Sequence, residues 1–417
     1  MQEMKDSGIE WIGEIPHSWK LERLQWHLEE VNISNNPIQT NNVLSLTNKL
    51  GVVPYEEKGN QGNKSKENVY EYKLAYPNTI VANSMNILIG SVGLCDYFGC
   101  VSPVYYVFRA KKYNNIKFLN YVFQTVGFQR ELRKYANGIL EIRLRVSSSD
   151  ILKRFIPFPS EIEQQRIAEF LDRECGKIDG LKADIQAQID TLEQYKRSII
   201  TEAVTHGLNP SAPMKDSGIP WVGQFPTHWT KKKGKYILRY MSKPVKQDDG
   251  VITCFRDGEV TLRSNRREDG FTMADKEIGY QGVDVGDLVV HGMDGFAGAI
   301  GISDSRGKAS PVLNVLNTKQ NKKYIMYYLR SMAYGEVFTA LSTGIRVRSC
   351  DLRWNKLAEL LYPLPPIDEQ NNIVNYIDEQ IARTNEIIAD KKSQIETLDG
   401  YKKSLIYEYV TGKKEVV

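Results

Sequence analysis

Residues 163–205 read EQQRIAEFLDRECGKIDGLKADIQAQIDTLEQYKRSIITEAVT, and residues 369–411 read EQNNIVNYIDEQIARTNEIIADKKSQIETLDGYKKSLIYEYVT. The two stretches align without a gap at a shift of 206 residues. In the first stretch apolar residues recur every seven positions, with two more apolar residues near the intermediate positions: Leu171, Ile178, Ile185, Leu192 and Ile199, then Leu181 and Tyr195. This period is typical of a coiled-coil seam and not of a strand. The sequence therefore predicts a long helix that packs lengthwise on a partner helix.

The second stretch keeps the seam less strictly. Ile377, Leu398 and Leu405 hold the same phase, Tyr401 aligns with Tyr195, and the remaining isoleucines run one face over, namely Ile381, Ile388 and Ile395. We therefore expect a partner helix with an imperfect seam. Helix boundary signals agree, because Ser160 with Glu163 predicts a capping box, and Gly207 and Gly412 follow the two helices.

The remainder of the chain is also duplicated. MKDSGIEWIGEIPHSW from Met4 returns as MKDSGIPWVGQFPTHW from Met214, and residues 80–104 return in outline at 288–312. Such self-similarity indicates a tandem repeat. The expected domains are, in chain order, a first globular part at 1–156, a first long helix at 157–206 and a linker at 207–213. A second globular part at 214–362, a second long helix at 363–412 and a tail at 413–417 follow.

Each globular part should mix helices and strands. Residues 79–82 and 104–107 resemble buried strands, and residues 115–135 have a helical pattern. Trp11, Trp19, Trp221 and Trp229 are expected in the cores, as large aromatic residues usually are. The predicted fold class is α+β, with two mixed α/β domains separated by two long antiparallel coiled-coil helices, and an internal pseudo-twofold repeat.

Composition gives few further constraints. The chain has 417 residues, of which 41% are apolar and 25% charged, which is typical of soluble domains. No segment is apolar enough to cross a membrane, and the start lacks the features of a leader peptide, so a cytoplasmic location is expected. Five scattered cysteines, at 95, 100, 175, 254 and 350, are expected as free thiols because their spacing fits no common zinc pattern.

Charge divides sharply along the sequence. Residues 20–156 hold 18 Lys and Arg against 11 Asp and Glu, and residues 230–362 hold 22 against 15, so each globular part carries +7. Residues 157–206 and 363–412 each carry −4. A basic globular part attracts phosphate, whereas an acidic helix would be repelled by a duplex. The globular parts are therefore the expected DNA-binding regions.

The candidate DNA-binding residues are basic side chains clustered with small polar ones, a combination that can read base edges in the major groove. In the first half they are Lys58, Lys64, Lys66, Arg143 and Arg145. In the second half they are Lys231, Lys232, Lys233, Arg263, Arg266, Arg267, Arg346 and Arg348.

The motifs of several enzyme classes are missing. Gly301 to Lys308 approaches a phosphate-binding loop, but its spacing is wrong and Ala309 replaces the magnesium-binding Ser or Thr. Glu56 and Lys58 lack the upstream acidic partner of a metal-dependent nuclease. Asn209-Pro210 lacks the Pro and aromatic residue with which amino-methyltransferases hold a flipped base, and the glycine fingerprint of a nucleoside cofactor is missing. We therefore expect a non-catalytic chain that binds no cofactor and no metal.

Three paired motifs carry a resemblance to a known family. They are the opening motif around Met4 and Met214, the P-x-P…EQ…I helix openings at Pro157 and Pro363, and the Y-K-x-S-hydrophobic-Ile helix ends at Tyr195 and Tyr401. In this order and number they resemble the specificity subunits of type I restriction-modification systems over the full length of the chain.

The resemblance implies that each globular part recognises one half of a bipartite site on double-stranded DNA. It implies that the helices set the spacer and dock two modification subunits, which carry S-adenosylmethionine, before two restriction subunits join with ATP and magnesium. A stand-alone bipartite DNA-binding regulator and a protein scaffold remain alternatives. The sequence does not identify the target bases.

Overall fold

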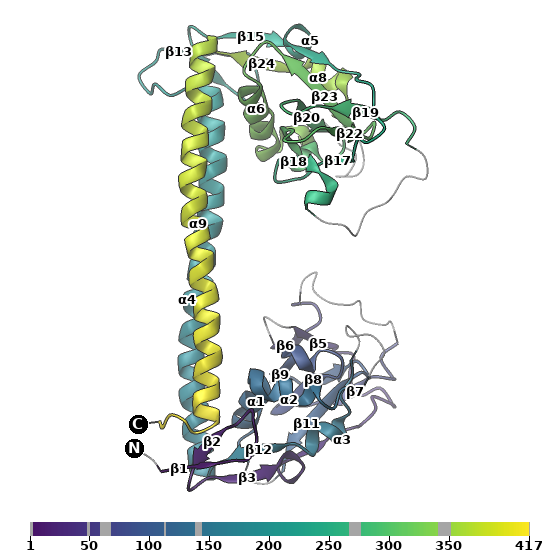
Figure 1. Ribbon diagram of the computed structural model, residues 1–417, viewed down its shortest axis with the longest axis vertical. Coiled ribbons are helices and arrows are strands. Elements are labelled where there is room, and N and C mark those ends of the chain that lie inside the picture. The colour runs from purple at the N-terminus through teal and green to yellow at the C-terminus, as the bar shows by residue number, and fades with distance from the viewer. Residues whose placement is uncertain are drawn as a thin grey trace. The chain divides into compact units, whose positions relative to one another are not determined.

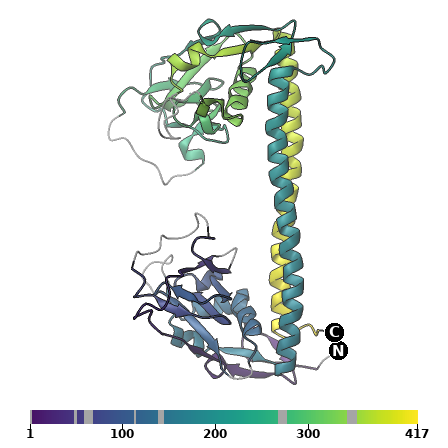
Figure 2. The same cartoon turned by 180° about the vertical axis from the view of Figure 1, so that it is seen from behind.

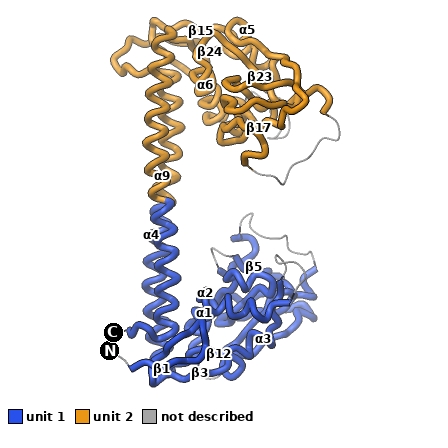
Figure 3. The backbone as a smooth tube through the Cα atoms, viewed as in Figure 1, with its two compact units in different colours: residues 1–185, 392–417 blue, residues 186–391 orange. Residues whose placement is uncertain are grey.

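The computed structural model describes residues 3–47, 51–58, 68–111, 114–137, 144–266, 277–340 and 352–416, and it divides into two compact units. Unit 1 consists of residues 1–185 and 392–417, and unit 2 consists of residues 186–391 (Figure 3). Two long helices, α4 (Glu161–His206) and α9 (Ile367–Val410), each contribute a segment to both units. Each unit is therefore a globular part together with one segment of each long helix.

The globular part of unit 1 combines short strands with short helices (Figure 1). Its elements are β1 (Met4–Asp6), β2 (Glu14–Pro16), β3 (Lys20–Arg23), η1 (Leu24–Trp26), β4 (Leu28–Glu30), β5 (Leu44–Thr47), β6 (Gly51–Pro54), β7 (Lys73–Ala75), β8 (Thr79–Asn83), η2 (Ile87–Ile89), β9 (Val92–Cys95), β10 (Gly99–Val101), β11 (Tyr105–Ala110), α1 (Ile116–Gln124), α2 (Val126–Arg133), α3 (Ser148–Leu152) and β12 (Phe155–Phe158).

Unit 2 follows the same order with small changes. Its elements are β13 (Met214–Asp216), β14 (Gln224–Pro226), β15 (Thr230–Lys233), α5 (Gly234–Ile237), β16 (Leu238–Tyr240), β17 (Ile252–Cys254), β18 (Val260–Leu262), η4 (Arg263–Asn265), β19 (Gln281–Val283), β20 (Leu288–His291), η5 (Gly295–Ala297), β21 (Ile300–Ile302), β22 (Gly307–Ala309), β23 (Leu313–Thr318), α6 (Lys322–Tyr334), α7 (Val337–Ala340), α8 (Trp354–Glu359) and β24 (Leu361–Leu364).

The sheets confirm the internal repeat. A four-stranded antiparallel sheet has the order β4-β11-β8-β9 in unit 1 and β16-β23-β20-β21 in unit 2. The same register recurs, because Val107 pairs with Val81 and Val315 pairs with Val289. A separate strand pair, β3 with β12 or β15 with β24, leads directly into the long helix that follows. The mixed α and β fold predicted for the globular parts is confirmed.

The helical region predicted at residues 115–135 consists of two helices. Thr125 separates α1 from α2, and its side chain serves both, since its hydroxyl donates to the Val122 carbonyl at 2.8 Å and accepts from the Phe128 amide at 3.4 Å. Threonine at this position ends one helix and caps the next because its hydroxyl replaces a backbone partner.

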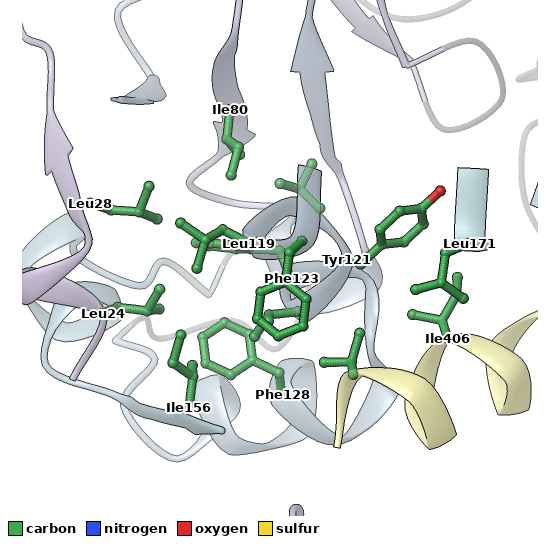
Figure 4. Packing of buried hydrophobic residues seen from close by; sticks show 14 of the residues in the cluster. Leu24, Leu28, Ile80, Leu119, Tyr121, Phe123, Phe128, Ile156, Leu171 and Ile406 are labelled. Carbon is green, nitrogen blue, oxygen red and sulfur yellow. The ribbon is translucent and has the colours of Figure 1, made fainter. Parts of the chain in front are cut away.

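The core of each unit joins its globular part to the long helices. In unit 1, Phe123 and Phe128 pack edge to face with ring centres 5.3 Å apart. Leu171 of α4 and Ile406 of α9 belong to the same buried cluster (Figure 4). Trp11, Trp19 and Trp229 are buried as expected, while Trp221 is half-buried and donates to the Tyr328 hydroxyl at 2.9 Å. The long helices are thus part of the cores and not appendages to them.

Within each unit the two helix segments lie side by side and antiparallel, as both views show (Figures 1 and 2). In unit 1 Lys182 contacts Asp399 and Lys402 contacts Asp179, so rising numbers on α4 meet falling numbers on α9. In unit 2 Lys196 donates to Asn385 and Lys391 donates to Gln188. The two long helices and their antiparallel pairing are confirmed.

The seam differs from its prediction in two details. The buried or half-buried residues of α4 that alternate with the predicted heptad are Cys175, Lys182, Ile189 and Lys196, whereas Leu181 and Tyr195 are exposed. In α9, Ile381, Ile388 and Ile395 share one seam with Ile377, Leu398 and Leu405. A seam alternates steps of three and four residues, so isoleucines that looked one face over are its second row. Lysines fill seam positions because their stems pack while their ammonium groups reach the neighbouring helix.

Among the described residues, no helix is long and apolar enough to span a membrane.

Candidate nucleic-acid and partner-binding surfaces

The helix openings attach each globular part to its long helix. Trp19 donates its indole N–H to Glu163 at 3.1 Å, and Trp229 donates to Glu369 at 3.0 Å. Ser160 and Glu163 form the predicted capping box, with the Ser160 hydroxyl donating at 2.7 Å. Burial raises the pKa of Glu163, but the hydrogen bonds from Ser160 and Trp19 outweigh it and the pKa is lowered. The tryptophan of the opening motif therefore recognises the glutamate of the EQ motif in both units.

The glutamine of each EQ motif is buried and completes this attachment. Gln164 accepts from the amide of Asn115, the N-cap of α1, at 3.1 Å, and donates to the Pro159 carbonyl at 3.1 Å. Gln370 makes the equivalent bonds to Asn321 at 3.0 Å and Pro365 at 2.9 Å. The sequence showed that Gln164 and Gln370 are repeated, but it did not indicate that they contact Asn115 and Asn321, which lie 49 residues earlier in the chain.

Six of the candidate DNA-binding residues lie outside the described residues. They are Lys64, Lys66, Arg143, Arg267, Arg346 and Arg348.

Most of the described candidates have partners within the protein. Lys58 is buried, with its ammonium group 4.2 Å from the centre of the Tyr55 ring. Lys231 donates to the Ser217 carbonyl, and Lys233 pairs with Glu359 at 2.7 Å. Arg263 donates to the Thr253 hydroxyl at 3.3 Å. These side chains are held by intramolecular contacts in the free protein.

Three further candidates differ in how they are held. Arg266 pairs with Asp257 at 2.7 Å and Glu259 at 3.1 Å and stacks on the Phe255 ring. Arg145 is exposed and approaches the Met85 sulfur at 3.7 Å, and Lys232 is exposed on β15. Arg145 and Lys232 are therefore the described candidates whose side chains are the most accessible to a phosphate or a base edge.

The structure brings Arg145 to a turn that recurs in both units. Val146 donates its amide to the Ser84 carbonyl at 3.3 Å, and Leu352 donates to the Gly292 carbonyl at 2.8 Å. Ser84 and Gly292 begin the equivalent turns that follow β8 and β20. Exposed apolar side chains lie on these turns, with Ile89 70% and Met293 54% exposed. The turn after β8 is thus bonded to Val146 in unit 1, and the turn after β20 is bonded to Leu352 in unit 2.

Arg256 is a basic residue of this surface that sequence reasoning missed. Its guanidinium, 63% exposed, donates to Asp294 of the unit 2 turn at 2.8 Å. A carboxylate that holds one edge of a guanidinium leaves the other edge oriented for a ligand. Alignment of the two halves could have indicated the turn, but only the fold shows that Arg256 reaches it.

A cavity of about 860 Å³ opens beside this turn within unit 2. Its charged lining comprises Lys196, Arg197, Arg256 and Arg330 together with Glu193, Asp257 and Glu336. The Tyr334 ring lies within 5.4 Å of Arg197 and 5.7 Å of Arg330. With four cations against three anions this lining is nearly neutral, so it does not resemble a phosphate pocket.

The helix segments carry exposed apolar residues at repeat-equivalent positions. In unit 1, Leu181 is 53% and Tyr401 is 56% exposed, and in unit 2 Tyr195 is 50% and Ile387 is 46% exposed. Each directly precedes a seam residue, namely Lys182, Lys402, Lys196 and Ile388. In an antiparallel pair these flanking positions of the two helices lie on the same face. Each unit thus presents one aliphatic residue and one tyrosine together beside its seam.

Of the other predicted helix residues, Leu171, Ile178, Ile199, Ile377, Ile388 and Leu405 are buried, while Ile185, Leu192, Ile395 and Leu398 are half-buried.

Within the described ranges no group of His, Cys, Asp and Glu could hold a metal ion. The described cysteines, Cys95, Cys100, Cys175 and Cys254, are free and buried, and burial raises the pKa of the Cys95, Cys100 and Cys175 thiols to about 11. Such thiols are protonated at neutral pH and are poor nucleophiles.

Comparison with known proteins supports the resemblance drawn from the motifs, although no family model matches the chain. The type I restriction enzyme StySPI specificity subunit of Salmonella potsdam is 18% identical over 320 residues, which cover 73% of this chain and 67% of that protein. In sequence the chain is therefore similar to a type I specificity subunit.

Solved structures show the same likeness in fold. A chain from a study of complex assembly and conformational transition of the type I R-M system has a TM-score of 0.67 at 12% identity, covering 96% of this chain and 99% of that one. The alignment with the HsdS subunit of Thermoanaerobacter tengcongensis covers 96% of this chain and 98% of that subunit, at 13% identity and a TM-score of 0.47. The first of these structures supports the fold. The resemblance to specificity subunits is confirmed by the sequence similarity to the Salmonella potsdam protein.

Proposed function

We propose that this chain is the DNA-recognition subunit of a type I restriction-modification complex. The observation that carries the proposal is the repeat itself, because the same globular part, the same helix opening and the same helix segment pairing occur twice in one chain. Two like units suit a target made of two short specific parts and a partner present in two copies. The similarity to a named specificity subunit agrees with this reading.

Each globular part is proposed to read one half of a bipartite site on double-stranded DNA. Its net charge of +7 favours the phosphate backbone through counterion release. Base contacts are assigned to the recurrent turns after β8 and β20 and to the candidate arginines Arg143, Arg145, Arg346 and Arg348. In unit 2 Arg256, held by Asp294, is added to the candidates of this surface.

The helix segments are proposed to dock two modification subunits. The exposed pairs Leu181 with Tyr401 and Tyr195 with Ile387 offer two like apolar patches, one in each unit. Tyrosine is enriched among residues that anchor protein interfaces because it buries a large area at low entropy cost. S-adenosylmethionine would be held by those subunits, and ATP and magnesium by two restriction subunits, so this chain supplies recognition and no catalysis.

Titration of labelled DNA tests the proposal. The chain alone is expected to bind a cognate duplex weakly, and addition of the modification subunit should raise the affinity by at least tenfold. Full affinity of the chain alone would instead indicate a stand-alone regulator. No affinity under either condition would indicate a protein scaffold.

A matched pair of variants separates the two surfaces. Arg346→Ala with Arg348→Ala should lower the affinity for DNA while the complex with the modification subunit stays intact, because an arginine contact to a base is worth about 1–3 kcal/mol. Tyr195→Lys with Tyr401→Lys should weaken the complex and leave the overall fold intact, because both side chains are exposed. Loss of the complex in the arginine variant would contradict the assignment.

A further inference from the structure

Each unit holds its globular part on the long helix at a second place, beyond the EQ motif. In unit 1 Asp172 of α4 accepts from Lys117 at 2.6 Å through one carboxylate oxygen and from the Tyr121 hydroxyl at 2.8 Å through the other. In unit 2 Asp378 of α9 accepts from Lys323 at 2.6 Å and from the Tyr327 hydroxyl. We call these two three-residue groups the helix clasps.

The clasps are equivalent in every member. Lys323, Tyr327 and Asp378 each lie 206 residues after Lys117, Tyr121 and Asp172. Both tyrosines belong to the cores of their units, and burial, followed by the bond to the aspartate, raises their pKa values. The hydrogen bond to Asp172 also raises the pKa of Lys117. Lys117, Tyr121 and Tyr327 therefore stay protonated and remain donors across the physiological range.

The clasp and the EQ motif hold the globular part at two separated points. Asp172 follows Gln164 by eight residues, about 12 Å along an α-helix. Apolar packing between the globular part and the helix is not directional, so it allows small rotations at little cost. Hydrogen bonds depend on distance and angle, and two such points on one axis resist rotation of the globular part across the helix.

Stability alone gives little reason for the clasp. The side chains of Lys117 and Asp172 are 51% and 39% exposed, and an exposed ion pair contributes about 0–1 kcal/mol. The directional role is therefore the larger one. Loss of the clasp should leave the unit folded but free to change its angle on the helix.

We infer that Lys117, Tyr121 and Asp172, and equally Lys323, Tyr327 and Asp378, are positioning residues that fix the angle of each recognition domain on its helix. They determine how strongly the complex prefers the cognate spacer length over other lengths, and they do not determine which bases are recognised. The inference rests on the proposed function, since only a bipartite reader has a spacer to measure.

The test compares the unit 1 variant Lys117→Ala/Tyr121→Phe with the parent chain, each in complex with the modification subunit. Removing both donors leaves Asp172 on the surface, where water can solvate it. Binding is measured on duplexes with the cognate spacer and with spacers one base pair shorter or longer. Arg109→Ala is the matched control, because the Arg109 pair with Glu29 is also exposed but lies on the sheet. Lys117→Arg in the parent background is the conservative variant.

The preference for the cognate spacer should fall at least threefold in the double variant, while the cost of each half-site base change stays as in the parent. The Arg109→Ala and Lys117→Arg chains should keep the parental preference. An equal loss of affinity for every spacer, or no change in preference, would overturn the inference. A parent complex without any spacer preference would instead contradict the proposed function.

A second measurement, on the chain alone, tests the role of the clasp independently of the proposed function. Spin labels are attached at Arg130→Cys on α2 and Lys177→Cys on α4, both exposed positions of unit 1, in a background with Cys350→Ser. The distance distribution between the labels should broaden in the double variant. An unchanged distribution would show that the clasp does not set the angle, whatever the function of the complex.

Discussion

At the scale of single residues, two glycines explain how each helix end meets an opening motif. A methyl group added at Gly207, which has φ +78°, would lie 3.1 Å from the Trp229 ring. Gly412, at φ +71°, faces Pro16 and the Trp19 ring. Both follow a long helix in the left-handed conformation, which glycine adopts without strain. The helix α4, from the first repeat, therefore ends against Trp229 of the second opening motif, within unit 2. The helix α9, from the second repeat, ends against Trp19 of the first opening motif, within unit 1.

Gly412→Ala should destabilise unit 1 by about 1–3 kcal/mol, because the alanine is strained at positive φ and its methyl group meets the Pro16 ring. Gly176→Ala is the matched control, since Gly176 lies inside α4 with open space around it, and alanine there should stabilise by up to about 1 kcal/mol. Urea unfolding of both variants measures the difference. Equal stability of the two chains would contradict this account of the helix end.

A second residue-scale prediction concerns pH. The bidentate Arg306 guanidinium, at 3.0 and 2.8 Å, lowers the pKa of Asp249 from 3.8 to about 2. A lowered pKa contributes stability above the unfolded value of 3.8, and that stability is lost as the pH falls from about 4 to about 2.

Asp249→Asn should therefore lower the melting temperature at pH 6 and flatten its fall between pH 4 and pH 2. Thermal unfolding followed across this range gives the comparison. A variant with the same slope as the parent would show that the pair does not contribute to acid sensitivity.

At the scale of elements, the sequence predicted the long helices well and their detailed seam less well. The seven-residue repeat of Leu171, Ile178 and Ile199 decided the helix, because it recurs with one period and ends at capping residues. Tyr195 and Leu181 were misplaced because apolar character alone does not separate a seam position from its neighbour. The burial of Cys175 and Ile189, with the half-buried Lys182 and Lys196 between and after them, shows where the second row runs.

The candidate surface was harder to foresee for a physical reason. Basic residues near polar ones in sequence can bind DNA or pair with acids elsewhere in the chain, and Lys233 with Glu359 and Arg266 with Asp257 do the latter. Arg256 was missed because its orienting partner, Asp294, lies 38 residues away. Long-range pairing of this kind follows from the fold and not from local pattern.

A truncation that ends at Gly207 tests the element-scale account. It frees residues 186–206, whose repeat equivalents at 392–412 pack in unit 1, so a second copy can supply the missing segment. The truncated chain should form a dimer and recognise an inverted repeat of its half-site. A monomer by sedimentation, at concentrations where the complete chain is folded, would show that the segments are not interchangeable.

At the scale of the whole molecule, we expect the paired helices to set the distance between the two half-sites. One heptad added after Ile185 and one after Lys391, where each helix passes from one unit to the other, keeps the seam in phase and adds about 10 Å. With DNA rising about 3.4 Å per base pair, the unread spacer should grow by about one to three pairs. Full affinity should then require some twisting of the duplex, because each added pair rotates a half-site by about 35°. An active variant that keeps the original spacer would show that the modification subunits set this distance.

The most direct test of the central claim is a map of modified adenines in a genome that carries this chain and its modification subunit. The account predicts modification confined to one motif with two short specific parts and an unread spacer of fixed length. Exchange of residues 20–156 for those of a relative should then change one part of the motif and leave the other part and the spacer unchanged. A motif that is unaltered by the exchange, or altered in both parts, would contradict the claim that each unit of this chain reads its own half of the site.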